Sequence, residues 1–274
     1  MSSTRSFRFP RRWLGYLSMA LIFATACLML SNWQFARRTE AATRVQLVAT
    51  NYDKAAVPLS QLAHNRADLD RSTLWSSAVV HGHYLPQFAT LVRNRVLDNE
   101  VGFETLVPFM LSSGEVVVID RGWIAAGTAD QPASPAPTTS AEPITLVFRI
   151  RATEPQITGQ ASTTTSLPTL NVAHYAQRWA APTYTALYGD LVSETPAAGS
   201  HGTLSPKPQY DEGNHLSYAF QWIAFAVLGF VALAWIIRRE LRLAAQEQTA
   251  KVRSRRANRD DTDEDALIDA QLNR

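Results

Sequence analysis

Two groups of polar and aromatic residues have the types and the spacing to bind a ligand or a partner. One group follows i, i+3, i+4 and i+7 spacing, which places an imidazole, a phenol and an indole on one face of a helix. Its members are His215, Tyr218, Ala219 and Trp222. The other group comprises Trp33, Gln34, Arg37 and Arg38. Polar groups at the boundary of an apolar helix are costly without partners, so both groups are functional candidates. A structural alternative stays open, in which His215 hydrogen-bonds the neighbouring helix and the aromatic rings anchor an interface.

Two long apolar segments must position these residues. Residues 13–33 and 218–237 contain no charged side chain, and each is long enough to cross a hydrocarbon core of about 30 Å as a helix. The first segment exceeds the length of a signal-peptide core, and no A-x-A cleavage site follows it, so we expect an uncleaved anchor rather than a cleaved secretory signal. The sequence therefore predicts a membrane protein with two transmembrane helices, and it places Trp33 and His215 at the same membrane boundary.

Basic residues near the ends of the two spans predict their orientation. Four arginines lie in the N-terminal segment, residues 1–12, and eight basic residues follow the second span between residues 238 and 259. Both termini are therefore expected in the cytoplasm, although Arg37 and Arg38 oppose this assignment. The charged tail, residues 238–274, has a basic cluster followed by an acidic one, and we expect it to be frayed or disordered beyond its first turns.

The segment between the spans, residues 34–217, is expected to form an extracytoplasmic domain rich in β-structure. After helical residues that continue to about Thr50, four runs rich in β-branched and aromatic residues predict strands in meander order. These runs are residues 75–84, 89–97, 103–111 and 115–123. An exposed loop at 128–143, strands at 144–153 and 183–192, and a short amphipathic helix at 171–179 complete the prediction. The expected fold class is α+β, a small sandwich or a partly closed barrel.

Composition and motifs argue against catalysis and nucleic-acid binding. Phosphate-binding, dinucleotide-binding, zinc-protease and haem-attachment motifs are absent from the sequence, so we predict that the protein is not an enzyme. Residues 34–217 carry 13 basic and 16 acidic side chains, which does not suit a nucleic-acid surface. The lone Cys27 excludes copper delivery through a cysteine pair. His81 and His83 are better explained as half-exposed strand residues than as metal ligands, and Asp120 and Arg121 as a structural turn.

Five short motifs are spread along the chain. They are WQFARR at 33–38, GHY at 82–84, the stretch from LVRNR to VP at 91–108, VVIDRGW at 117–123 and NHLSYAFQW at 214–222. Together they resemble the surfeit locus protein 1 family of cytochrome c oxidase assembly factors. The first motif lacks the lysine that usually follows its arginines in that family, and residues 128–168 show no family motif.

The resemblance implies a non-catalytic role in building the catalytic subunit of a haem–copper terminal oxidase, by holding haem a and passing it to that subunit. His215 matches the position of the family's proposed axial ligand of the haem iron. The other candidate haem contacts are Arg37 and Arg38 for the propionates and Trp33, Tyr218 and Trp222 for the ring. The implied partners are the oxidase catalytic subunit, other assembly factors and the lipid bilayer. The implied location is the plasma membrane of a bacterium, or the inner mitochondrial membrane of a eukaryote.

Two other function classes remain open at this point. A haem-independent membrane chaperone or scaffold for an oxidase subunit would use the same motifs through protein contacts alone. A two-span sensor would bind a small ligand outside and signal through its tail. The 37 residues from 238 to 274 are too few for a kinase or cyclase domain, which makes the sensor the weaker of the two.

Overall fold

The computed structural model describes residues 11–128, 131–163 and 166–272, with the backbone alone for Thr128 and for residues 255–272. Most of the expected N-terminal segment 1–12 lies outside the described residues, as do two residues of the expected loop at 128–143. The chain divides into two compact units. One contains the chain up to Ala41 and from Glu212 onward, and the other spans Ala42–Asp211.

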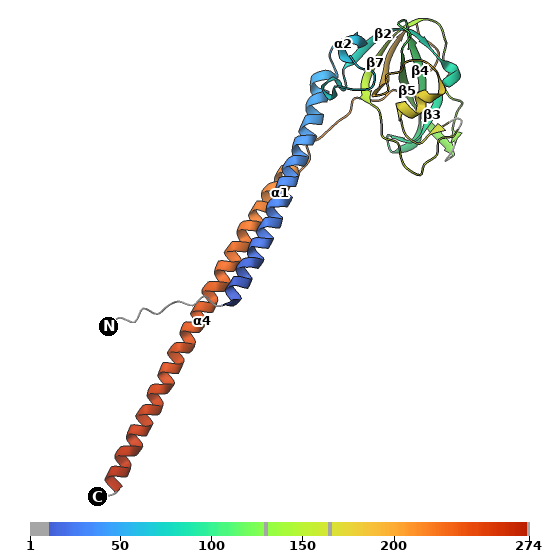
Figure 1. The fold of residues 1–274 in the computed structure, drawn as a ribbon. Coiled ribbons are helices and arrows are strands. Elements are labelled where there is room, and N and C mark those ends of the chain that lie inside the picture. Colours follow the sequence, from blue (N-terminus) through green and yellow to red (C-terminus); the bar gives the residue numbers. More distant parts are fainter. Residues whose placement is uncertain (1–10, 129–130, 164–165, 273–274) are drawn as a thin grey trace. The chain divides into compact units, whose positions relative to one another are not determined.

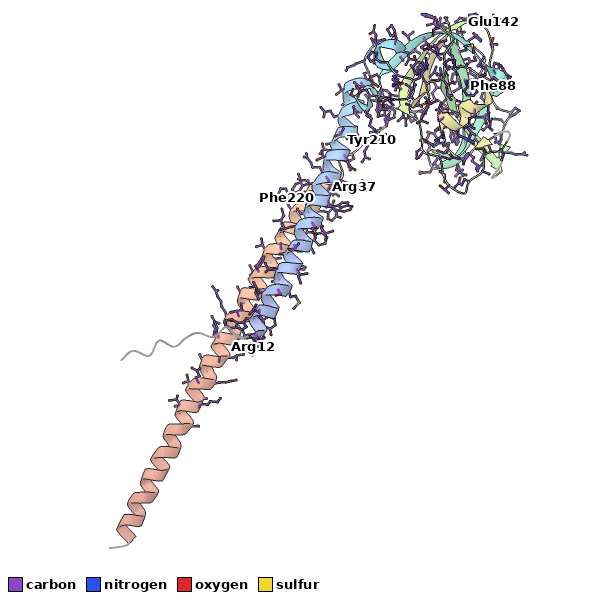
Figure 2. All side chains as sticks on the ribbon, viewed as in Figure 1. Arg12, Arg37, Phe88, Glu142, Tyr210 and Phe220 are labelled. Atoms are coloured by element: carbon purple, nitrogen blue, oxygen red, sulfur yellow. The ribbon has the colours of Figure 1, made fainter. Side chains whose placement is uncertain are left out.

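Two long helices form the first unit. Helix α1 spans Arg11–Asn51, and helix α4 spans His215–Leu272. They run antiparallel and side by side (Figure 1), because Trp13 of α1 donates a hydrogen bond from Nε1 to Glu240 of α4 at 2.7 Å, while Phe35 contacts Phe220 with ring centroids 6.0 Å apart. Figure 2 shows Arg12 at one end of this pair and Phe220 toward the other. Both helices are long and apolar enough to cross a membrane, by length and composition.

The surface between the two helices is built from small residues. Its buried members are Ala24, Cys27, Ser31, Ala219 and Ala226. Small side chains at an interface allow helix backbones to approach closely, which is the usual way for apolar helices to pack in a lipid environment. Large apolar side chains such as Ile22, Met29 and Leu228 are instead 58–72% exposed on the outward faces. A large exposed apolar surface is the pattern expected for helices that face lipid.

Both helices extend beyond the apolar segments. The continuation of α1 past Trp33 was expected and is confirmed, since the helix ends only at Asn51. The expectation of a frayed or disordered tail is wrong, because α4 continues to Leu272. The tail contains many alanine, leucine, arginine, glutamine and glutamate residues, which are strong helix formers, and this local preference favours continuation of the helix.

A small closed β-barrel forms the second unit. Its ring consists of β2 (Ser77–Tyr84), β7 (Ile144–Ala152), β9 (Leu187–Thr195), β5 (Val116–Thr128) and β4 (Glu100–Leu111). The ring closes because β2 pairs with β7 along most of its length and with β4 at its end, where Tyr84 lies opposite Phe109. The sheet is mixed, since β5 and β9 are parallel whereas the other ring pairs are antiparallel.

Shorter elements surround the ring. The remaining strands are β1 (Val57–Pro58), β3 (Thr90–Leu97), β6 (Gln131–Pro132) and β8 (Ser166–Leu167). The short helices are α2 (Leu59–Leu62), α3 (Val172–Tyr175) and the 3₁₀ turns η1 (Arg71–Thr73), η2 (Pro86–Phe88) and η3 (Ala176–Arg178). The predicted amphipathic helix at 171–179 is confirmed by α3 and η3, with Val172 and Tyr175 fully buried.

Alternate side chains of the five ring strands fill the barrel. The interior residues include Val80, Phe109, Ile119, Leu146, Phe148, Ile150 and Leu191, all at most 5% exposed. A barrel this small has no channel, because side chains fill its interior. A second apolar cluster lies on the outer face, where Tyr175 and Val172 cover Leu106 and Val118. Of the two α+β arrangements predicted, a sandwich or a partly closed barrel, the structure is nearer the second, and its ring closes through β2 and β4.

Two details of the strand prediction are wrong. The four strands do not form a simple meander, because β2 pairs with β4 and β7 rather than with β3. The turn η2 separates β2 from β3. Strand β3 then pairs with the first part of β4, whereas β2 pairs with the last residues of β4. The last strand is β9 at Leu187–Thr195 rather than 183–192, because Thr183 makes only an isolated bridge to Val116.

Candidate functional site

His215 is the first residue of α4 and hydrogen-bonds to the other long helix. Its Nδ1 lies 2.9 Å from Oε1 of Gln34 on α1. Since an amide oxygen only accepts, Nδ1 carries the proton in this bond and Nε2 keeps a free lone pair. A half-buried imidazole held in this tautomer is oriented as a metal-binding histidine usually is, with the nitrogen that does not bind the metal fixed by a hydrogen bond.

Two arginines lie on the next turn of α1 after Gln34. Arg38 pairs with Glu212, three residues before His215, at 3.2 Å, and Arg37 pairs with Glu40 at 2.8 Å. The Arg37 guanidinium also lies 5.9 Å from the ring centroid of Trp33. All four charged side chains in these pairs are 43–56% exposed, so each pair contributes little stability.

The structure places the six candidate residues in two different environments. His215 and Trp222 lie on the face of α4 that packs on α1, with Ala219 completely buried between them. Trp33 and Tyr218 are 52% and 51% exposed, so their rings are available to a ligand or to lipid. The i, i+3, i+4, i+7 face is therefore split: its histidine and indole face α1, and its phenol is half exposed.

Sequence reasoning missed the acidic partner of this cluster. Glu212 stands in the connection just before α4, and only the helix start at His215 brings its carboxylate to Arg38. The one signal in the sequence that could have identified Glu212 is its position, three residues before the candidate histidine. Together, one imidazole, two guanidiniums and two exposed aromatic rings can bind a flat, anionic, metal-containing ligand at the end of the helix pair.

A second cluster of polar side chains is buried in the barrel. Arg121 is 1% exposed, and its guanidinium binds both carboxylate oxygens of Glu194 at 3.0 and 3.2 Å. Tyr84 donates a hydrogen bond to the same carboxylate at 2.7 Å and stacks under Arg121 at 4.8 Å. Burial alone would raise the pKa of Glu194, but the hydrogen bonds from Arg121 and Tyr84 outweigh it and lower that pKa. This closed network supports the prediction that Arg121 has a structural role.

Buried acids lie on the outer face of the barrel. Asp120 of β5 pairs in register with Asp190 of β9, and Glu104 of β4 lies near both. Burial raises the pKa of Asp120, and the nearby charges of Glu104 and Asp190 raise it further. Burial likewise raises the pKa of Glu104 to about 7, although Arg95 contacts its carboxylate at 2.9 Å and opposes the rise. Asp120 also accepts a hydrogen bond from the Gly122 amide at 2.9 Å, which agrees with a structural turn.

The class of protein is defined by a candidate membrane helix before and after a small β-barrel in the sequence, with a helix-end histidine beside two arginines. The SURF1 family model matches residues 21–227, and the chain belongs to that family. The family is linked to cytochrome oxidase assembly and is not a known enzyme class. The chain is also 28% identical over 245 residues to uncharacterised SURF1-like proteins of Mycobacterium bovis and Mycobacterium tuberculosis, covering 85% of this chain and 88% of each relative.

Proposed function

We propose that this protein is an integral membrane assembly factor that binds haem a and helps its insertion into the catalytic subunit of cytochrome c oxidase. The observation that carries the proposal is the hydrogen bond from His215 to Gln34, because it leaves Nε2 of a fixed, accessible imidazole as a ligand. Haem a, when bound, supplies an iron that accepts a neutral imidazole and two propionates that need cationic partners.

The arginines suit a cargo that must be released. Arg37 and Arg38 already hold carboxylates in exposed ion pairs, so a propionate can replace Glu40 or Glu212 with little net cost. Guanidinium groups bind carboxylates in a bidentate fashion, which fixes the orientation of a planar ligand. Trp33 and Tyr218 present exposed rings on the two helices, and Trp222 lies closer to the surface between them.

The proposed location is the plasma membrane of a bacterium, with both termini in the cytoplasm, or the inner mitochondrial membrane if the source is a eukaryote. Two helices of sufficient length and apolar composition support membrane insertion, and the mycobacterial relatives support a bacterial setting. The helix-end site would then lie at the outer boundary of the bilayer. We propose that the β-barrel contacts the oxidase catalytic subunit or other assembly factors.

The test is the optical spectrum of the full-length protein purified in detergent from cells that synthesise haem a. We expect a Soret band in the wild type, its loss in His215→Ala, and its retention in His201→Ala, which removes an exposed histidine of the β domain. Gln34→Leu should shift or weaken the band, because the imidazole loses the group that fixes its tautomer. A wild-type protein without the band, or a band unchanged in His215→Ala, would overturn the haem proposal.

A haem-independent chaperone is the second candidate, and one observation favours it. The bond between His215 and Gln34 joins the two helices, which is also the purely structural role open to this histidine. A strain that produces only His215→Ala separates the two functions. The carrier predicts an oxidase without haem a while the variant remains abundant in the membrane, whereas the chaperone predicts a normal haem content in whatever oxidase assembles.

A further inference from the structure

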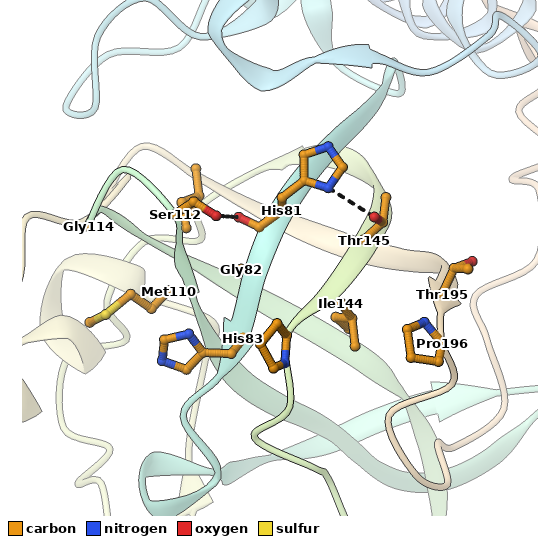
Figure 3. Close-up of a pocket in the computed structure, with 12 residues that line it drawn as sticks. His81, Gly82, His83, Met110, Ser112, Gly114, Ile144, Thr145, Thr195 and Pro196 are labelled. Carbon is orange, nitrogen blue, oxygen red and sulfur yellow. Dashed lines mark hydrogen bonds between the residues drawn. The ribbon is translucent and has the colours of Figure 1, made fainter.

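A cleft of about 640 Å³ on the outer face of the barrel does not direct its histidines toward one point. Nδ1 of His81 lies 2.9 Å from the Thr145 hydroxyl on β7, whereas the His83 ring projects toward Met110 on β4 (Figure 3). The two imidazoles therefore contact different strands, and the cleft does not form a metal site. Charged side chains without partners lie instead on helix α4.

Three arginines follow the apolar segment of α4. Arg238, Arg239 and Arg242 are exposed, and among the side chains that the structure describes none of the three pairs with a carboxylate. Residues three and four apart are neighbours on a helix surface, so Arg242 lies beside both of the other arginines. The three positions fall within an arc of about 100° around the helix axis. They therefore form a compact positive patch.

Glu240 lies between these arginines in sequence but does not neutralise them. It is two residues from both Arg238 and Arg242, which places it on the opposite side of the helix. Its carboxylate accepts a hydrogen bond from Nε1 of Trp13 at 2.7 Å and pairs with Arg12 of α1 at 3.2 Å. The negative charge of Glu240 is therefore directed toward α1, whereas the positive patch faces away from α1.

The same side of α4 carries exposed apolar side chains in the turns before the arginines. Leu228, Val231 and Trp235 are 58%, 58% and 61% exposed. Their spacing of three and four residues continues into the arginines, which places all six side chains on one face. The Arg239 guanidinium lies 5.6 Å from the ring centroid of Trp235. This face of residues 228–242, the α4 outer face, therefore joins an apolar stripe to three cations.

We propose that the α4 outer face binds an anionic phospholipid. Its guanidinium groups hold the phosphate through charge-assisted, bidentate hydrogen bonds, and its apolar side chains lie along an acyl chain. Basic clusters beside membrane helices recognise anionic lipid headgroups in this way. A soluble phosphate would use the arginines alone, so the adjoining apolar stripe specifies a lipid. The inference rests on the proposed membrane location and is independent of haem binding.

The test is native mass spectrometry of the full-length protein in detergent, titrated with phosphatidylglycerol or with phosphatidylcholine of the same acyl chains. We expect the wild type to bind the anionic lipid at least about fivefold more tightly. The double variant Arg238→Gln, Arg242→Gln should reduce this preference to less than about twofold, because two of the three phosphate contacts are lost. The matched control is Lys251→Gln, Arg253→Gln, which removes two exposed positive charges further along α4 and should keep the preference.

Three outcomes would overturn the lipid site. They are equal affinity of the wild type for both lipids, a preference that survives in the Arg238→Gln, Arg242→Gln variant, and displacement of phosphatidylglycerol by millimolar inorganic phosphate. Circular dichroism should show that the double variant keeps its helices, and the His215→Ala protein should show the wild-type preference. Extraction of the wild type from membranes by sodium carbonate would overturn the membrane location as well, whereas loss of lipid selectivity alone leaves that location intact.

Discussion

At the scale of single residues, one group of buried and half-buried carboxyl groups on the outer face of the barrel is only partly paired with arginines. Arg95 contacts Glu104 and Glu154, and Arg151 contacts Asp190, while Asp120 has only the Gly122 amide among its described hydrogen-bond partners. Desolvation favours the neutral form of a buried carboxyl group. Glu104 therefore keeps its proton to a higher pH than an ordinary glutamate, because its pKa is raised to about 7.

This raised pKa predicts that stability falls as pH rises. The folded protein binds the Glu104 proton more tightly than the unfolded chain does. The stability that this proton contributes is therefore fully present below the ordinary glutamate pKa of about 4.3, and it is lost as pH rises through about 7. Glu104→Gln should remove the part of this dependence that Glu104 contributes, on the order of 2 kcal/mol between pH 5 and 8. Thermal unfolding of the full-length protein in detergent at several pH values measures it.

The matched control is Glu100→Gln, which changes an exposed acid at the start of the same strand. Its profile should follow that of the wild type. Parallel profiles for wild type and Glu104→Gln would mean that Glu104 does not titrate in this range. The dependence that remains in Glu104→Gln would belong to Asp120 and Asp190, whose pKa values are also raised by burial.

The residue types at the helix-end site were accessible from sequence, but their pairing was not. His215 and Arg38 stand out because they flank apolar segments. Their partners Gln34 and Glu212 depend on how two helices far apart in sequence align. In the barrel, Arg121 was recognised as part of a turn, but its pair with Glu194 joins strands 73 residues apart and left no local pattern.

At the scale of elements, the bend in β5 depends on one glycine. Gly122 has φ of +106°, and a Cβ there would meet the Gly202 carbonyl carbon at 2.7 Å. Around it, Thr105 donates a hydrogen bond to its carbonyl at 3.0 Å, and the chain at Thr203 pairs with Trp123. Local strand propensity gives no measure of such a close approach between two backbones.

Gly122→Ala should therefore destabilise the barrel more than Gly114→Ala does. Both positions have positive φ, but a Cβ at Gly114 meets only open space. Gly114→Ala should lower the free energy of unfolding by about 1 kcal/mol, because alanine is strained at positive φ. Gly122→Ala should lower it by at least about 2 kcal/mol more, because its Cβ also clashes with the backbone. Chemical unfolding of the full-length variants compares them. Equal losses would show that the Gly202 segment moves aside.

Strand existence was predicted at this scale, and strand order was not. Runs rich in β-branched and aromatic residues, and alternation of apolar residues at 144–153, located the five ring strands, although the last was placed too early in the sequence. The order depends on the pairing of β2 with β7 and β4, a long-range contact that periodicity does not encode. The packing of the long helices could not be predicted either, since Ala24, Cys27 and Ala226 do not differ from their neighbours in the apolar segments by any sequence pattern.

At the scale of the whole molecule, the distribution of basic residues predicts which side of the membrane each part occupies. The arginines of residues 1–12 and the basic residues of 238–259 are the strongest positive clusters, and such clusters usually stay in the cytoplasm. Residues 42–211 should then be extracytoplasmic. Since Cys27 is the one cysteine and is 1% exposed, cysteine labelling can test this with little background.

In a Cys27→Ala protein, Ala161→Cys places a thiol on the barrel and Ala250→Cys places one on α4, and both positions are exposed. A membrane-impermeant maleimide added to intact cells, or to spheroplasts where an outer envelope blocks it, should label Ala161→Cys and leave Ala250→Cys unlabelled. Both should react after permeabilisation, which controls for access. The reverse pattern would place the barrel in the cytoplasm and would move the His215 site to the inner boundary. Labelling of both before permeabilisation would show that the two helices do not both cross the bilayer.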